Sequence, residues 1–414
     1  MSWANVRKRL DREMCNSDWQ DMFPKFRVKH VTAPNSDHLP ILLYTHMETS
    51  KGVRPFRFEA MWARDASSLE VVENAWSFLV EGSHNLKLIK RFQFVHKKLI
   101  SWNKLVFGFA KARIKDIEDQ ISKLQFLAPS KENLELEATL NLEFNEWMER
   151  EEVKWRQKSR DLWLRKGDRN SKFFHLFTII RGRCNFFAEI KLNNGQWIQS
   201  REEIEKYFKE NFLEVYHSSI PDISPELDDL FSPCITAEEN MELSCVPSPQ
   251  EIKDVIWDMH PLKAPGPDGF LELFFKQYWF MVGPQVVLAI QFFFFFFAEG
   301  WMLPQVNHTF ITLIPKKVGA CNFNQFRLIS LCNFYYKVIP KIIVNRIRSI
   351  LSKVIDPTQA AFVPHRWITK NVILAQEVVH NFKKKKRNYG LVGLKIDFHK
   401  AYGVYNPGLT SYGF

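Results

Sequence analysis

Residues 391–397 read Leu-Val-Gly-Leu-Lys-Ile-Asp, and this short run is the starting point for the fold class that the sequence predicts. Its apolar residues form the pattern of a buried strand, and the run ends in a carboxylate, Asp397. An acid at the end of an apolar strand is costly unless it meets a cation or solvent. Asp397 is therefore a candidate Mg²⁺ ligand for phosphoryl or nucleotidyl transfer, although on spacing alone a helix cap or a salt-bridge partner is the commoner role.

The charge of the chain points to a polyanionic partner. The 414 residues are 46% hydrophobic and carry a net charge of +11, which fits a folded protein that binds nucleic acid or an anionic membrane surface. Residues 341–400 contain thirteen Lys and Arg against three acids, so this stretch alone carries +10. A local concentration of positive charge favours nucleic-acid binding, and a solvated surface is the alternative interpretation.

Cysteine spacing and apolar runs exclude several other classes. The six cysteines form no Cys-x-x-Cys pair and stand beside no histidine at zinc-finger spacing, so we expect neither a zinc site nor a disulfide framework. The first residues contain no apolar leader, which predicts an intracellular protein of the cytoplasm or nucleus that is not secreted. The apolar run at 286–298 is shorter than the roughly 20 residues of a bilayer span, so it predicts a buried helix and no membrane partner.

The first half of the chain divides into a β-rich part and a helical part. Alternating residues at 27–31 and an apolar run at 41–44 predict the last strands of a sheet domain over residues 1–65. Gly and Pro are rare from 69 to 181, and apolar residues recur there every three or four positions. These residues are Phe107, Ala110, Ile114, Ile117, Ile121 and Leu124. We therefore expect a helical linker over residues 66–217, with a short coiled-coil hairpin as one option.

The second half begins after a Pro-rich boundary. Five prolines crowd into residues 218–249 together with acidic residues, which is typical of a domain boundary. From residue 250 to 414 helices and loops alternate. This region has a strand expected at 309–315 and a long basic helix expected at 333–354.

Four blocks of residues in the second half carry a family resemblance. They read Phe-Arg-Leu-Ile-Ser-Leu-Cys-Asn at 326–333, Lys-Val-Ile-Pro-Lys at 337–341, Ala-Phe-Val-Pro-His-Arg-Trp-Ile-Thr at 361–369 and Leu-Lys-Ile-Asp-Phe-His-Lys-Ala-Tyr at 394–402. In order and spacing they resemble the reverse transcriptases of LINE-type, non-LTR retrotransposons, of the kind abundant in plant genomes. Upstream, Lys-Ala-Pro-Gly-Pro-Asp-Gly-Phe at 263–270 and the run at 310–316 are similar to the segment that precedes the fingers in this family.

The first half resembles the same retrotransposon polyproteins. Residues 163–175 look like the connector between endonuclease and polymerase, and Ser-Asp-His at 36–38 looks like a turn of the metal-dependent endonuclease. The resemblance implies an α+β chain. Residues 1–65 would be the C-terminal remnant of a β-sandwich endonuclease of the endonuclease/exonuclease/phosphatase type. A helical linker would follow at 66–217, and the partial fingers and palm of a reverse transcriptase would occupy 250–414.

Residue roles follow from the resemblance, position by position. Asp397 would bind catalytic Mg²⁺, and Asp37 and His38 would act in the endonuclease. Four residues would contact the incoming nucleotide: Arg327, Arg366, Phe398 through its backbone carbonyl, and Tyr402. The basic residues that would contact the RNA and DNA of the template–primer are Lys341, Arg346, Arg348, Lys383, Lys384, Lys385, Lys386 and Arg387.

Several positions depart from the family pattern. Gly403 stands where the family has Asp, His365 stands where it has the Gly of Pro-Gly-Arg, and Leu328 replaces a Pro. No later Asp-Asp box follows Asp397, and two-metal catalysis needs at least two carboxylates. We therefore expect a reverse transcriptase that is truncated after its first catalytic aspartate and inactive. The alternatives are a basic, non-catalytic nucleic-acid-binding fragment and a nonfunctional pseudogene product, and the oligomeric state stays open.

Overall fold

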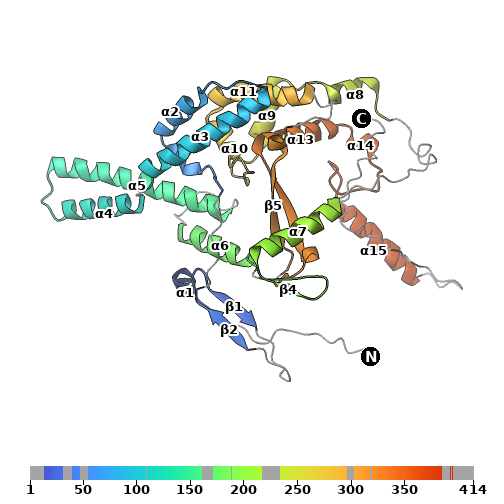
Figure 1. Ribbon diagram of the computed structural model, residues 1–414, viewed down its shortest axis with the longest axis horizontal. Helices are drawn as coiled ribbons and strands as arrows, with labels where there is room; N and C mark the ends of the chain where they lie inside the picture. Colours follow the sequence, from blue (N-terminus) through green and yellow to red (C-terminus); the bar gives the residue numbers. More distant parts are fainter. Residues whose placement is uncertain are drawn as a thin grey trace.

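Helices dominate the structure, and its strands occur only in pairs. The computed structural model describes residues 14–30, 40–46, 55–108, 110–160, 171–187, 189–216, 234–295, 303–317 and 319–384, with residues 392 and 394. Over these residues the strands form three separate two-stranded antiparallel sheets (Figure 1). The chain is therefore of the α+β class, as the sequence predicts.

The N-terminal part is a helix followed by a β-hairpin. Helix α1 spans Ser17–Met22, and strands β1 (Arg27–His30) and β2 (Ile41–Tyr44) pair with Arg27 opposite Tyr44. All four residues of β2 are exposed. Among the described residues of 1–65 this two-stranded ribbon has no second layer against which to bury a face, and the expected remnant of a β-sandwich endonuclease stays a prediction.

The largest core joins segments that are far apart in the sequence. On α3, Leu88, Phe92, Val95, Leu99 and Trp102 recur at helical spacing and are buried against residues 252–342. The elements that build this core are η1 (Ala60–Arg64), α2 (Ser67–Trp76), α3 (His84–Val106), α9 (Pro249–Asp258), α10 (Glu272–Gln277), α11 (Trp279–Phe295), α12 (Pro304–Asn307) and α13 (Phe334–Ile347). Residues on both sides of the Pro-rich segment 218–249 thus share one core.

A long helical hairpin projects from this core. Helix α4 (Ala110–Gln125) lies against α5 (Lys131–Ser159), with Ile117 and Leu140 buried between them (Figure 1). Arg113 joins the two helices by a salt bridge to Glu143 at 2.9 Å. Helix α6 (Ser171–Cys184) packs along the other end of α5.

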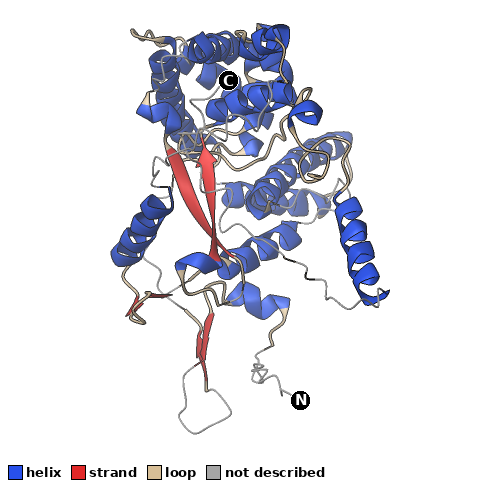
Figure 2. Ribbon diagram, turned by 90° about the vertical axis from the view of Figure 1, so that its right-hand side faces the viewer, coloured by secondary structure: helices blue, strands red, loops and turns tan. Residues whose placement is uncertain are grey.

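A second, smaller core supports the longest β-hairpin. Strands β5 (Thr309–Pro315) and β6 (Phe326–Cys332) pair over their full length, which confirms the strand expected at 309–315. Figure 2 shows this hairpin as the longest pair of strands. Its base packs with β3 (Ile190–Lys191), β4 (Trp197–Ile198), η4 (Phe323–Gln325) and α7 (Arg201–Tyr216).

The remaining helices correct one expectation and confirm another. The basic helix expected at 333–354 is interrupted, because α13 ends at Ile347 and α14 covers only Leu351–Val354. The Ser349 hydroxyl donates to the Arg346 carbonyl at 2.8 Å, and such a bond competes with helix continuation. Helix α11 buries much of the apolar run at 286–295, as expected. No helix among the described residues has the length and hydropathy to cross a bilayer.

Helices α8 (Ala237–Ser244) and α15 (Ile368–Lys384) complete the described structure. Thr236 and Glu239 form a capping box at the start of α8, which satisfies two backbone N–H groups that a helix leaves unpaired. On α15, apolar residues such as Val372 and Val379 are exposed.

Candidate functional site

Most of the predicted catalytic residues lie outside the described part of the chain. Asp397, Phe398 and Tyr402 belong to this group, as do Asp37 and His38. Lys385, Lys386 and Arg387 are outside it too, and Lys383 and Lys384 end helix α15 without a described side-chain position. The described part of the predicted site therefore consists of the β5–β6 hairpin, α13 and the loops that hold them.

Asp268 anchors the loop between α9 and α10 to the start of α13. Its Oδ2 accepts a hydrogen bond from the Phe334 N–H at 3.1 Å, and its Oδ1 accepts one from the Phe270 N–H at 3.3 Å. In return, the Asp268 N–H donates to Asn333 Oδ1 at 3.0 Å. Asn333 Nδ2 donates to the Gln305 carbonyl at 3.1 Å. These four bonds satisfy helix-terminal groups and join three segments that are distant in the sequence.

Two glycines allow this loop to approach its neighbours closely. A Cβ atom on Gly266 would lie 2.3 Å from the backbone of Cys332. Gly269 has φ +76°, and a Cβ there would lie 2.4 Å from the Phe56 carbonyl oxygen. The Lys337 ammonium donates to the Ala264 carbonyl at 2.7 Å. Gly266 is thus required by its close approach to the end of β6, and Gly269 by its positive φ and its approach to Phe56.

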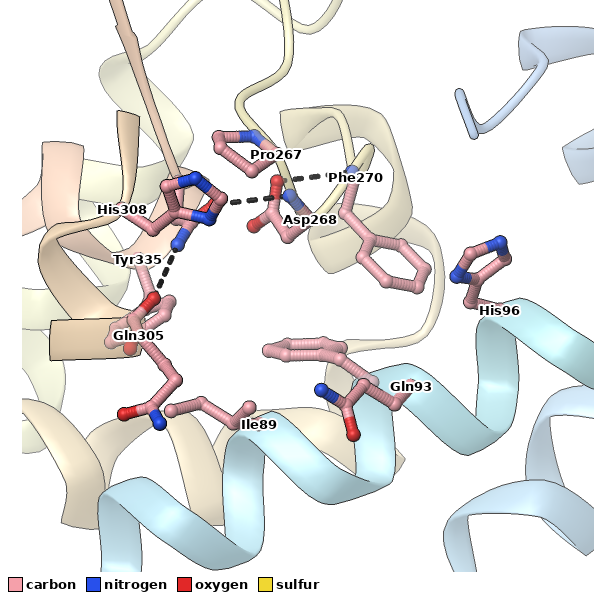
Figure 3. A pocket seen from close by; sticks show the side chains of 11 residues that line it. Ile89, Gln93, His96, Pro267, Asp268, Phe270, Gln305, His308 and Tyr335 are labelled. Atoms are coloured by element: carbon pink, nitrogen blue, oxygen red, sulfur yellow. Dashed lines mark hydrogen bonds between the residues drawn. The ribbon is translucent and has the colours of Figure 1, made fainter. Parts of the chain in front are cut away.

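A cavity of about 280 Å³ lies beside this anchor. Figure 3 shows Asp268 and His308 on one side of it, facing Ile89, Gln93 and His96 of α3. Asp268 as a residue is half-buried, but protein atoms surround its carboxylate. The loss of hydration disfavours the charged form and raises the pKa of Asp268 to about 7. The sequence did not lead us to predict that Asp268 anchors this loop. An acidic residue within a loop of glycines and prolines is the signal that could have indicated it.

Against the larger effect of burial, the positive charge of Lys337 acts on the Asp268 carboxylate to lower its pKa. Burial lowers the pKa of the Lys337 ammonium, even though the Asp268 carboxylate acts to raise it. Both groups therefore shift toward their neutral forms, which is the effect of removing charges from water. The buried Tyr335 hydroxyl lines the same cavity and has no hydrogen-bond partner among the described residues. The cavity can thus take up or release a proton near neutral pH.

The β5–β6 hairpin presents Arg327 to solvent. Arg327 lies opposite Ile314 in the register, and its side chain is exposed. The neighbouring pair Leu313 and Leu328 packs against the smaller core, because successive residues of a strand point to opposite faces. Arg327 is therefore placed on the hairpin with its side chain accessible to a ligand.

Two of the basic residues predicted to bind nucleic acid form ion pairs within the protein. The Arg346 guanidinium binds both carboxylate oxygens of Glu251 at 2.8 Å and also donates to the carbonyls of Leu243 and Cys245. Lys341 forms a salt bridge of 3.0 Å with Asp258. Arg348, in contrast, is exposed. Arg346 thus holds the connection between α8 and α9 against α13.

Arg366 stabilises its own loop. Its guanidinium donates to the carbonyls of Ile355 at 3.0 Å, Asp356 at 2.5 Å and Gln359 at 2.8 Å. The preceding residue, His365, has φ +62°, which is the left-handed conformation that glycine adopts most easily. This is the position at which the sequence departs from the Pro-Gly-Arg pattern, so the conformation explains why glycine suits it.

The described residues contain no group of three or more His, Cys, Asp or Glu side chains that could hold a metal ion. The expected Mg²⁺ ligand, Asp397, lies beyond them. Binding of a catalytic metal ion would therefore depend on Asp397, which lies outside the described residues.

Two comparisons show which known proteins this chain resembles. Residues 314–403 match the family of reverse transcriptases (RNA-dependent DNA polymerases). The Transposon TX1 uncharacterized 149 kDa protein of Xenopus laevis is 26% identical over 324 residues, which make up 74% of this chain and 24% of that protein. The chain thus spans about a quarter of the length of this relative. The family match begins in β5 and includes β6, α13, α14 and α15.

Proposed function

We propose that this chain is, by descent, part of the RNA-directed DNA polymerase of a non-LTR retrotransposon, and that it retains the nucleotide-binding and template-binding part of that function. One observation carries the proposal: the described part of the family match at 314–403 begins in the β5–β6 hairpin and continues through α13. Asp268 and Asn333 anchor this part to the helical core. An anchored hairpin with an accessible arginine is a suitable platform for a nucleotide and a template strand.

The residue roles in this proposal follow the family motifs. Asp397 would bind a catalytic Mg²⁺ together with the backbone carbonyl of Phe398, and Tyr402 would line the nucleotide pocket. Arg327, which is exposed on β6, would approach the triphosphate, where a planar guanidinium suits phosphate oxygens. When bound, Mg²⁺ would stabilise negative charge on the reacting phosphate.

The proposed partners are the RNA and DNA of a template–primer, which places the protein in the cytoplasm or the nucleus. The basic residues from Lys383 to Arg387 would contact the phosphate backbone. Residues 1–65 would descend from an endonuclease, with Asp37 and His38 as its remaining catalytic residues. The family resemblance of the Ser-Asp-His turn supports this part of the proposal.

Nucleotide cross-linking tests the proposed role of Asp397. The 414-residue chain would be incubated with an RNA–DNA template–primer and a photoreactive deoxynucleoside triphosphate, with and without Mg²⁺. We expect Mg²⁺-dependent cross-linking that falls at least roughly tenfold in Asp397→Asn, because the metal loses an anionic ligand. Asp254→Asn, which changes the same charge on the exposed face of α9, is the matched control.

The outcomes separate a polymerase from a simple basic protein. Cross-linking that needs Mg²⁺ and Asp397 supports the proposal. Cross-linking that ignores both, or template–primer binding without salt dependence, would contradict it, since phosphate contacts release counterions.

A further inference from the structure

A cluster of arginines lies at the C-terminal end of α5. Arg160 caps the helix in the left-handed conformation, with φ 57° and ψ 24°. The Arg181 guanidinium of α6 donates to the Ser159 carbonyl at 3.2 Å, which places it beside this cap. Burial, followed by repulsion from Arg57 and Arg181, lowers the pKa of the Arg160 guanidinium. Three positive groups therefore lie close together, with Arg160 partly buried and Arg57 and Arg181 exposed.

A cavity of about 490 Å³ opens between these residues. Arg57, Lys158 and Arg160 line it, together with Pro265 of the loop that Asp268 anchors. The one carboxylate in its lining, Glu59, lies 3.9 Å from Lys158. Within the described part of the chain, no carboxylate forms an ion pair with the three arginines of the cluster. Arg160 is thus a partly buried cation that has no carboxylate partner among the described residues, and such a group favours an anionic ligand.

Helix α6 leads to this cavity and carries exposed aromatic rings. Phe173 and Phe177 are 39% and 37% exposed, and their rings stack at 5.8 Å with an interplanar angle of 20°. Arg181 follows at the same helical spacing, so the three residues share one face. Thr178 of this helix lines the cavity. Exposed rings beside a basic groove are the combination that binds single-stranded nucleic acid, because bases stack on the rings and phosphates bind the cations.

We propose that Arg57, Arg160 and Arg181 bind a backbone phosphate of a single-stranded nucleic acid whose bases stack on Phe173 and Phe177. The inference rests on the proposed function in taking nucleic acid as the partner. It adds a contact surface outside residues 341–400, where the sequence concentrates its charge. An acidic peptide would satisfy the arginines but would leave the two stacked rings without a flat partner.

Fluorescence anisotropy tests the site with the 414-residue chain and a labelled oligouridylate of about 16 nucleotides. The principal variant is Arg160→Gly, because glycine adopts a positive φ without strain and the substitution therefore removes the charge while keeping the helix cap. Arg57→Gln is the second variant, and its side chain is exposed. We expect the double variant to bind roughly tenfold more weakly and its log–log salt slope to flatten by about 1 to 2 units.

Lys131→Ala is the matched control for the loss of charge. Lys131 begins α5, its side chain is 89% exposed, and 29 helical residues place it roughly 40 Å from Arg160. Thermal melting would verify that each variant is folded. Phe177→Ala tests the stacking part, since it should weaken oligouridylate binding and leave competition by inorganic phosphate unchanged.

The outcomes distinguish this inference from the proposed function. The parent chain should bind both oligouridylate and the template–primer. If the folded double variant then binds oligouridylate as tightly as the parent chain, only the proposed phosphate site is overturned. A parent chain that binds neither oligouridylate nor the template–primer would overturn both proposals. Weaker oligouridylate binding in the double variant, with Lys131→Ala unchanged, supports the site.

Discussion

Two groups of arginines in this chain have opposite surroundings. Arg346 lies within the most basic stretch of the sequence, yet it binds Glu251 and two backbone carbonyls inside the fold. Arg57 and Arg160 lie outside that stretch and, among the described residues, form no ion pair. The density of charge along the sequence therefore does not tell which charges are available to a ligand. Pairing in the folded state decides it.

The largest expected effect comes from removing an arginine that holds the fold. We expect Arg346→Ala to lower the free energy of unfolding by about 3 kcal/mol, because it leaves Glu251 half-buried without its partner and two carbonyls without donors. Urea denaturation measures the change. Oligouridylate affinity of the folded variant should stay within about twofold, as expected for a structural role.

Arg348→Ala is the matched control, two residues away on an exposed position. Its effect on stability should stay within about 0.5 kcal/mol. If Arg348→Ala destabilised the chain as much as Arg346→Ala, the distinction between paired and available charges would fail.

Asp268 is a carboxylate that stabilises the fold, and its titration predicts how stability depends on pH. The pKa of Asp268 is raised to about 7, so the folded state binds this proton more tightly than the unfolded state does. Stability from this group is present at low pH and is lost as pH rises from about 4 through 7. After a discount for partial exposure, we expect a loss on the order of 2 kcal/mol over this window.

Asp268→Asn tests that expectation because it keeps the shape and removes the titration. Unfolding measured at several pH values should show a flatter profile between about pH 4 and 7 in the variant. The variant should also lose one acceptor bond, to either Phe334 or Phe270. A parent and a variant with parallel pH profiles would show that Asp268 titrates normally in the folded protein.

The smallest expected effect concerns the loop that Arg366 holds. His365 has φ +62°, a conformation that costs a side-chain-bearing residue about 1 kcal/mol relative to glycine. We therefore expect His365→Gly to raise the free energy of unfolding by up to about 1 kcal/mol. Thermal melting detects this change, and His365→Ala, which keeps the Cβ atom, should not show it. Equal melting temperatures for the two variants would contradict the proposed strain.

Local patterns allowed much of the secondary structure to be predicted. The strand at 309–315 and the buried helix at 286–295 follow from side-chain periodicity, which is a property of neighbouring residues. The long basic helix was predicted wrongly, because the break after Ile347 depends on Ser349 bonding to a carbonyl and on burial of Ile350. The endonuclease remnant expected at 1–65 stays a prediction, since the patterns at 27–31 and 41–44 indicate strands but not how many layers cover them.

Only those residues of the candidate site that lie within a family motif were predicted from the sequence. Arg327 was predicted from its block, and the structure places it on an exposed hairpin position. Asp268 was not predicted as an anchor, because its partner Phe334 is 66 positions away. The Arg160 cluster was not predicted either, since its members come from three segments that meet only at the end of α5.

The sequence by itself determined the resemblance to reverse transcriptases, the α+β class, the strand β5 and the net charge, because each follows from composition or from neighbouring residues. The tertiary structure alone decided which charged groups are paired and which backbone positions are left-handed. Arg346 meets Glu251 across 95 positions, and no local pattern specifies such a contact. The physical reason is that the energy of a charge depends on its burial and its neighbours, and both are fixed only when distant segments pack together.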